Sequence, residues 1–116
     1  MNNKILQKGY DLLKTLPDQK YKLVAIVTDK RDRILSYGCN SYTKSHPQQA
    51  YYAEKIGNKF SIFLHAEISA LIKCKRKPYS IYIIRVNDKN QPVLAKPCEI
   101  CMMAIKDMGI ENIHYT

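Results

Sequence analysis

The feature that most restricts how this chain can fold is a pair of cysteines, Cys98 and Cys101, separated by two residues. Pro97 precedes them and suits the start of a helix, because the first helical residue needs no hydrogen bond from its N–H. A helix from Cys98 to about Met108 would place both thiols in its first turn. The unpaired N–H groups of that turn carry positive potential that favours thiolates. The pair therefore predicts a metal site at a helix start.

The segment His65-Ala66-Glu67 stands at the start of another predicted helix, the third along the chain, over residues 66–72. Each of the two helices follows a strand or loop that brings its N-terminus to the same edge of the sheet. One histidine and two thiolates leave the fourth position of a zinc ion open, as in catalytic sites, whereas structural sites usually have four protein ligands. We therefore predict Zn²⁺ bound by His65, Cys98 and Cys101.

The remaining apolar pattern predicts helices alternating with strands. Apolar residues recur at helical spacing until Pro17, and Pro47 and Gly57 suit the two ends of a short helix. Short apolar runs predict strands, whereas residues 38–41 and 87–96 are expected to form loops. The predicted elements are helices over 3–16, 47–56, 66–72 and 98–108, and strands over 21–27, 34–37, 79–86 and 110–115. This order predicts an α/β fold, a three-layer α/β/α sandwich with a mixed sheet of about four strands.

Length and composition are typical of a single-domain globular protein. The 116 residues support one hydrophobic core, and 46% of them are apolar without a run long enough to span a bilayer. The N-terminus leads into an amphipathic pattern rather than a signal peptide, so we expect a cytoplasmic protein without a membrane partner. In a reducing compartment cysteines bind metal more often than they form disulfides. Cys39 and Cys74, outside the motif, are expected to be ordinary half-buried thiols.

The net charge of +9 has two explanations that the sequence leaves open. A basic surface attracts phosphates and suits a nucleic-acid partner. Alternatively, an excess of lysine in a chain also rich in asparagine, isoleucine and tyrosine reflects the composition of an AT-rich genome. The basic cluster at the end of the third predicted helix, Lys73, Lys75, Arg76 and Lys77, separates two kinds of substrate. A polynucleotide is favoured if the cluster lines a groove to the metal, and a free nucleotide if it faces away.

His65-x-Glu67 together with Pro97-Cys98-x-x-Cys101 resembles the signature of the zinc-dependent cytidine and deoxycytidylate deaminase superfamily. The order of predicted elements is similar to that family's core over most of the chain. The resemblance implies a zinc-dependent hydrolase acting on a cyclic amidine, in which Glu67 moves protons from water to a ring nitrogen and to departing ammonia. The alternative is a structural zinc or a scaffold without activity, but a retained acid that is not a ligand argues against it.

The resemblance also suggests substrate contacts. In similar deaminases an asparagine after the second strand hydrogen-bonds the sugar, and Asn40 stands at that place, although it also suits a turn. Lys44 and His46 follow in a segment whose polar groups suit a phosphate. Lys96 occupies a position where relatives often carry Ser or Glu, and its carbonyl could accept a hydrogen bond from the exocyclic amine. With Ala66, these residues make up the predicted substrate-binding set.

Three functions stay open on the sequence. The first is hydrolytic deamination of a cytosine base in a nucleoside or a nucleotide such as deoxycytidylate. The second is deamination of a base within tRNA or single-stranded nucleic acid, and the third is a non-catalytic zinc domain that binds a partner. Thr116 directly follows the fourth predicted strand. We therefore expect the fifth strand of this superfamily to be absent, and the open sheet edge to pair in a homo-oligomer.

Overall fold

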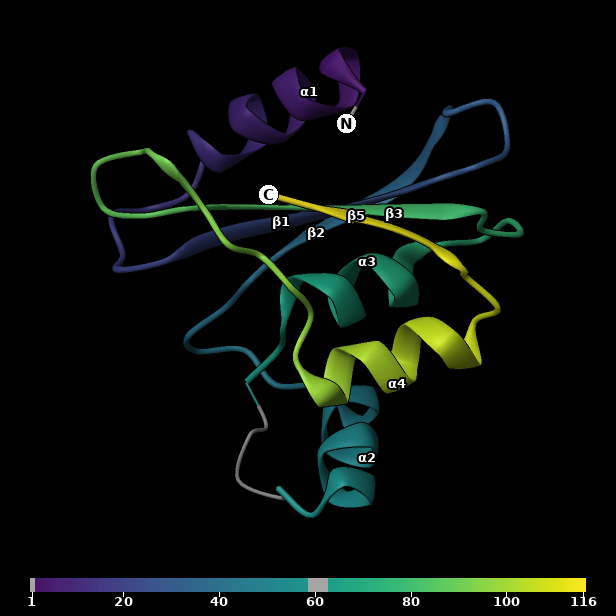
Figure 1. Cartoon of the computed structure of the whole chain (residues 1–116). Helices are drawn as coiled ribbons and strands as arrows, with labels where there is room; N and C mark the ends of the chain where they lie inside the picture. Colours follow the sequence, from purple (N-terminus) through teal and green to yellow (C-terminus); the bar gives the residue numbers. More distant parts are fainter. Residues whose placement is uncertain (1, 59–62) are drawn as a thin grey trace.

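The computed structural model describes residues 2–58 and 63–116 and contains the helices and strands that the sequence predicts (Figure 1). In chain order its elements are α1 (Asn3–Leu13), β1 (Lys22–Thr28), β2 (Ile34–Cys39), α2 (Pro47–Ile56), α3 (Ala66–Lys73), β3 (Ser80–Val86), β4 (Pro92–Val93), α4 (Glu99–Asp107) and β5 (Asn112–Tyr115). α1 ends at Leu13, before the predicted residue 16, and the Thr15 hydroxyl in the following turn donates to the Leu12 carbonyl oxygen at 2.6 Å. No helix among the described residues is both long and apolar enough to cross a membrane.

The strands form one mixed sheet, as predicted. β1 pairs antiparallel with β2 and with β3, and the far edge of β3 carries β4 antiparallel and β5 parallel. β4 corrects the prediction of a loop over residues 87–96 and raises the expected four strands to five. The Asn87 side-chain oxygen accepts hydrogen bonds from the backbone N–H groups of Lys89 and Gln91, at 2.9 and 3.0 Å. These bonds close a tight turn that returns β4 to β3.

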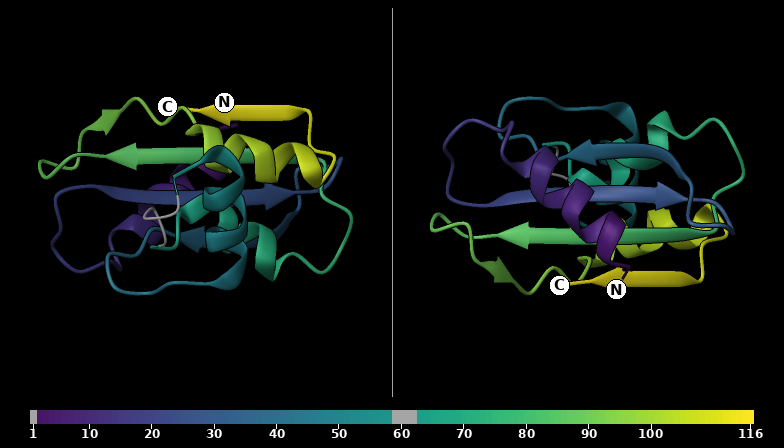
Figure 2. Two further views of the ribbon diagram at one scale, coloured as in Figure 1. Left: turned by 90° about the horizontal axis from the view of Figure 1, so that it is seen from below. Right: turned by 90° about the horizontal axis from the view of Figure 1, so that it is seen from above.

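Helices cover both faces of the sheet, which gives the predicted three layers (Figures 1 and 2). α1 lies against one face, where its apolar side packs near Val24 and Ile26 of β1. α3 and α4 lie on the other face, over Ala25 and Val27, and α2 packs against α4. Alternate residues of β1 belong to two separate cores because side chains along a strand point to opposite faces. Both predicted metal-binding helices therefore belong to one layer.

α3 packs very closely against β2, and this contact sets the position of the candidate site. A Cβ atom on Gly38 would lie 2.5 Å from the backbone nitrogen of Ala70, so a larger residue does not fit without movement. The Ser36 hydroxyl donates a 2.7 Å hydrogen bond to the Ala70 carbonyl oxygen. β2 accordingly extends to Cys39, through two residues that were expected to lie in a loop.

Candidate active site

His65 precedes the first residue of α3, and a buried glutamine of α2 fixes its backbone. The Gln49 side-chain oxygen accepts a 3.1 Å hydrogen bond from the His65 backbone N–H, and Gln49 is 0% exposed. The His65 carbonyl oxygen accepts a helical hydrogen bond from the Ser69 N–H at 3.0 Å. Hydrogen bonds to both the N–H and the carbonyl oxygen of His65 therefore hold its imidazole at the start of the helix.

Cys98 and Cys101 lie at the start of α4. Cys98 is the N-cap residue, and its carbonyl oxygen accepts a 2.8 Å hydrogen bond from the Met102 N–H. Pro97 is buried immediately before it, where a fixed backbone angle suits entry into a helix. Cys101 is buried and Cys98 is exposed. One sulfur thus lies in the core and the other at the surface of the same site.

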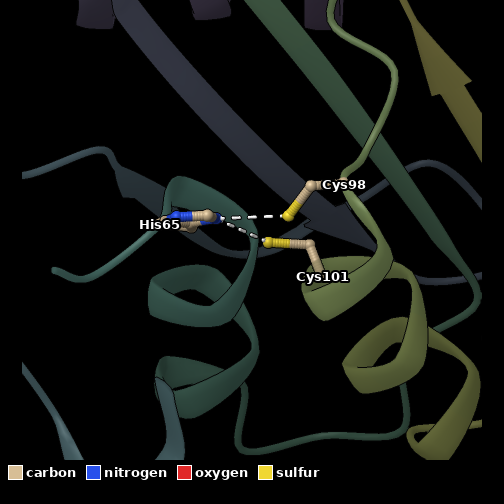
Figure 3. Close-up of side chains that lie close together, drawn as sticks. All are labelled: His65, Cys98 and Cys101. Atoms are coloured by element: carbon tan, nitrogen blue, oxygen red, sulfur yellow. Dashed lines mark hydrogen bonds between the residues drawn. The ribbon is translucent and has the colours of Figure 1, made fainter. Parts of the chain in front are cut away.

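The three predicted ligands converge from the two helix starts (Figure 3). His65 Nδ1 lies 3.2 Å from Cys101 Sγ and 3.5 Å from Cys98 Sγ, and all three atoms lie within 4.8 Å of one another. Around a tetrahedral zinc, nitrogen and sulfur ligands are about 3.6 Å apart, given bonds of about 2.1 and 2.3 Å. The donor set and its spacing therefore fit Zn²⁺. In the described part of the chain the group has three members, which leaves a tetrahedral position for a non-protein ligand.

The surroundings of the cluster stabilise one thiolate. A hydrogen bond from the Cys101 thiol, together with His65, lowers the pKa of Cys98 to about 4. The same hydrogen bond and burial raise the pKa of Cys101 well above its usual value. The hydrogen bond with Cys98 also raises the pKa of His65. A divalent cation would replace the proton shared by the sulfurs and bind both as thiolates.

Glu67 lies beside the cluster in the first turn of α3, and it is only 4% exposed. Burial raises the pKa of its carboxyl group. Together with His65 and Cys98, Glu67 lines a pocket of about 490 Å³, a size typical of small-molecule sites. A buried acid and a metal-binding cluster therefore share one cavity.

The chain as a whole matches a protein family with this chemistry. Residues 2–116 match the family model described as the cytidine and deoxycytidylate deaminase zinc-binding region. The chain belongs to this family. No curated protein matches the chain. The family and the His65, Cys98 and Cys101 cluster together assign Zn²⁺ as the cofactor of this deaminase domain.

The deaminase pocket is lined by three of the five predicted substrate contacts, Asn40, Ala66 and Lys96. Lys44 and His46 do not line it within the described residues. His46 instead caps α2, because its Nδ1 accepts a 3.0 Å hydrogen bond from the Gln48 N–H. The Lys44 side chain is exposed, while its backbone belongs to the turn before α2. These two residues therefore lie outside the lining of the pocket, and their contact with a substrate phosphate stays a prediction.

Asn40 is held by the chain entering β1 as well as by its own strand. Its side-chain oxygen accepts a 2.9 Å hydrogen bond from the Leu23 N–H, and its amide nitrogen donates to the Tyr21 carbonyl oxygen at 3.1 Å. These bonds fix the side chain at the wall of the deaminase pocket. Within the described residues they leave the second amide N–H able to donate to a ligand.

The predicted set of site residues did not include several lining residues, although two of them, Ser41 and Tyr42, belong to the polar segment expected at the rim. These lining residues are Tyr21, Leu23, Ser41, Tyr42, Phe63, Leu64 and Arg85. Arg85 did carry a signal in the sequence, because it is the one charged residue of the apolar strand β3. Tyr42 and Phe63 are exposed aromatic residues of loops. Whether these two side chains line the pocket depends on the conformation of the loops, which no periodicity in the sequence predicts.

Proposed function

We propose that this deaminase-family protein catalyses hydrolytic removal of the exocyclic amino group from a cytosine base in a free nucleoside or nucleotide. One observation carries the proposal. Glu67 is buried, and it lines the same pocket as His65 and Cys98 of the metal cluster. A purely structural zinc site would gain nothing from an acid buried at its side, since moving an ionised carboxyl group out of water is costly.

Bound zinc would supply activation of a water molecule, which hydrolytic deamination of a stable base requires. The chain itself supplies the proton carrier. In the proposed reaction the Glu67 carboxylate accepts a proton from the attacking water and donates it to the ring nitrogen next to the reacting carbon. It then passes the second proton of that water to the amino group, which leaves as ammonia. Burial of Glu67 limits exchange of these protons with bulk water.

Three pocket residues are proposed to orient the substrate. The Ala66 N–H lies at the start of α3, where backbone N–H groups lack helical partners, and can donate to the carbonyl of the base. The Asn40 amide can donate to a sugar hydroxyl, and the Lys96 carbonyl can accept from the exocyclic amine. Together these contacts would hold the base with its reacting carbon towards the metal cluster.

The position of the basic cluster, Lys73, Lys75, Arg76 and Lys77, favours a free nucleoside or nucleotide over a polynucleotide. α3 has eight residues, so its two ends are about 12 Å apart. Glu67 lies in the first turn, whereas the basic cluster lies at and beyond the last turn. None of its four residues lines the deaminase pocket. The net charge had two explanations, a nucleic-acid partner and the composition of the genome. The position of the basic cluster makes the nucleic-acid explanation the weaker of the two.

The proposal is tested by measuring bound zinc and ammonia release on a panel of substrates. The panel contains cytidine, deoxycytidine, deoxycytidylate, adenosine, single-stranded DNA and tRNA. We expect turnover of the free cytosine compounds. Turnover of tRNA or single-stranded DNA alone would replace the proposal by the polynucleotide alternative, and a zinc-loaded protein silent on the whole panel would support a non-catalytic domain. The cytoplasmic location and the homo-oligomer stay proposals, and light scattering would measure the latter.

A further inference from the structure

Arg85 is a charged residue on an otherwise apolar face of the sheet. Side chains alternate along β3, so Arg85 follows Ile81 and Ile83 on the side covered by α3 and α4. Both isoleucines are 0% exposed. Arg85 stands where this row leaves the core, and its side chain lines the deaminase pocket. The fold thus places a cation at the wall of the site.

Arg85 also lies in a fixed position relative to Asn40. Leu23 of β1 pairs with Arg85 of β3, and on its other side the Leu23 carbonyl oxygen accepts a 3.1 Å hydrogen bond from the Asn40 N–H. The three residues form a row across neighbouring strands. Two strand spacings of about 4.8 Å put the backbones of Asn40 and Arg85 about 10 Å apart. A ligand that reaches Asn40 with its sugar can therefore direct a substituent towards Arg85.

Two contacts hold the Arg85 guanidinium in place, and neither is with a negative group. Its central carbon lies 4.1 Å from the centroid of the Tyr21 ring, and Nη1 donates to the Leu94 carbonyl oxygen at 3.2 Å. Its Nε is buried and has no hydrogen-bond partner within the described residues. Within the described residues Nη2 makes no hydrogen bond, so this nitrogen can donate to an oxyanion in the pocket. The stacked guanidinium suits this role because its geometry is set before the ligand arrives.

Lys96 adds a second positive charge to the same pocket. Neither Lys96 nor Arg85 belongs to an ion pair in residues 2–58 and 63–116, where Asp18 and Asp29 pair with other cations. Glu67 is the one carboxylate among the described lining residues, and it lies beside the metal cluster. The outer wall of the pocket therefore carries positive charge that no other described lining residue balances.

We propose that Arg85 and Lys96 bind a phosphate group of the substrate, so that the site prefers a cytosine nucleotide to the unphosphorylated nucleoside. The inference rests on the proposed function for the identity of the base. It adds the substrate class and the residues that select it. The ligand is the free nucleotide, with the phosphate at the outer wall and the base at the metal cluster.

The test compares kcat/KM for deoxycytidylate and deoxycytidine in the wild type, Arg85→Gln and Lys96→Gln. Arg76→Gln is the matched control, because it removes the same type of charge at the far end of α3. Loss of one charged hydrogen-bond donor weakens binding by about tenfold to a hundredfold. We expect the preference for deoxycytidylate to fall by about that factor in Arg85→Gln, by a smaller factor in Lys96→Gln, and not in Arg76→Gln. An equal fall in both substrates would mean that Arg85 only supports the fold, and would overturn the proposal.

Calorimetric binding of the same two compounds to the zinc-loaded protein gives a readout that does not need turnover. Tighter binding of deoxycytidylate in the wild type, lost in Arg85→Gln, would support the phosphate site even if neither compound were deaminated. That combination would refute the proposed reaction but not the phosphate site. Equal binding of both compounds by the wild type would overturn the phosphate site. So would tighter binding of a short single-stranded cytosine oligonucleotide than of deoxycytidylate.

Discussion

The position of the His65 imidazole depends on a side chain from another helix. His65 was predictable as a ligand because its residue type and its spacing from Glu67 carry the chemistry. Gln49, whose side chain fixes the His65 backbone, was not predictable. It follows Gln48 in an unremarkable helix sequence, and Gln48 is exposed while Gln49 is buried. Only the packing of α2 on α3 distinguishes the two glutamines.

Replacing Gln49 with leucine is expected to destabilise the protein. The change leaves the half-buried His65 N–H without its Gln49 acceptor, and an unsatisfied donor of this kind costs up to about 1–3 kcal/mol in the free energy of unfolding. Urea unfolding measures this cost, and Gln48→Leu provides the neighbouring exposed control. Equal stability of the two variants would show that the Gln49 contact does not hold the start of α3.

The substrate contacts show the same limit of prediction. Asn40 and Lys96 were predicted from their places beside a strand end and a helix start, and both line the pocket. Lys44 and His46 were chosen by chemistry in an irregular segment, and the direction of their side chains depends on the turn before α2. Arg85 was overlooked because it was taken as part of a strand, where the alternation of faces decides which residues reach the site.

The two helices that carry the metal ligands, α3 and α4, pack against different neighbouring elements. α3 rests on β2 through Gly38, while α4 packs against α2 and α3. Both helix starts could be predicted, because Pro97 and the motif residues carry local signals. β4 could not, since its two residues pair only because the far edge of β3 is available beside them.

A Gly38→Ala substitution is expected to push α3 away from β2. The added Cβ would lie 2.5 Å from the Ala70 backbone nitrogen, and backbone cannot yield as a flexible side chain can. Overpacking of this kind costs about 1–3 kcal/mol. Gly57→Ala is the comparison, because no described residue lies within 4 Å of its Cβ position, and its positive φ of 85° is the unfavourable feature. Urea unfolding should rank Gly38→Ala below Gly57→Ala in stability, and the reverse order would contradict the close α3–β2 contact.

A metal ion shared by α3 and α4 would link residues far apart in the chain. A ligand that binds only the folded state stabilises it, and the free energy of binding zinc then adds to the free energy of unfolding. Removal of zinc with a chelator is therefore expected to lower Tm by more than about 5 °C. Cys101→Ser should show a low Tm that the chelator no longer changes, whereas Cys74→Ser should behave as the wild type. A chelator-insensitive wild type that contains zinc would place the metal outside this cluster.

The distribution of charge over the protein bears on what it binds. The net charge of +9 alone does not show whether the protein binds nucleic acid. The structure separates the cluster at the end of α3 from Arg85 and Lys96, which line the deaminase pocket. The sequence already placed the basic cluster and Glu67 at opposite ends of one helix. It could not show that Arg85 and Lys96 share the pocket, because this depends on how β3 and the segment before α4 pack together.

The most direct test of the proposed mechanism is the zinc content and ammonia release of Glu67→Gln beside Glu54→Gln, an exposed control on α2. Glu67 is proposed to carry protons and not to bind metal, so Glu67→Gln should keep zinc at the level of the wild type. Its rate of ammonia release from deoxycytidylate should fall by about a hundredfold to ten-thousandfold, the usual contribution of a general acid–base group. Glu54→Gln should match the wild type in both measurements. A zinc-loaded Glu67→Gln protein that releases ammonia as fast as the wild type would contradict the account.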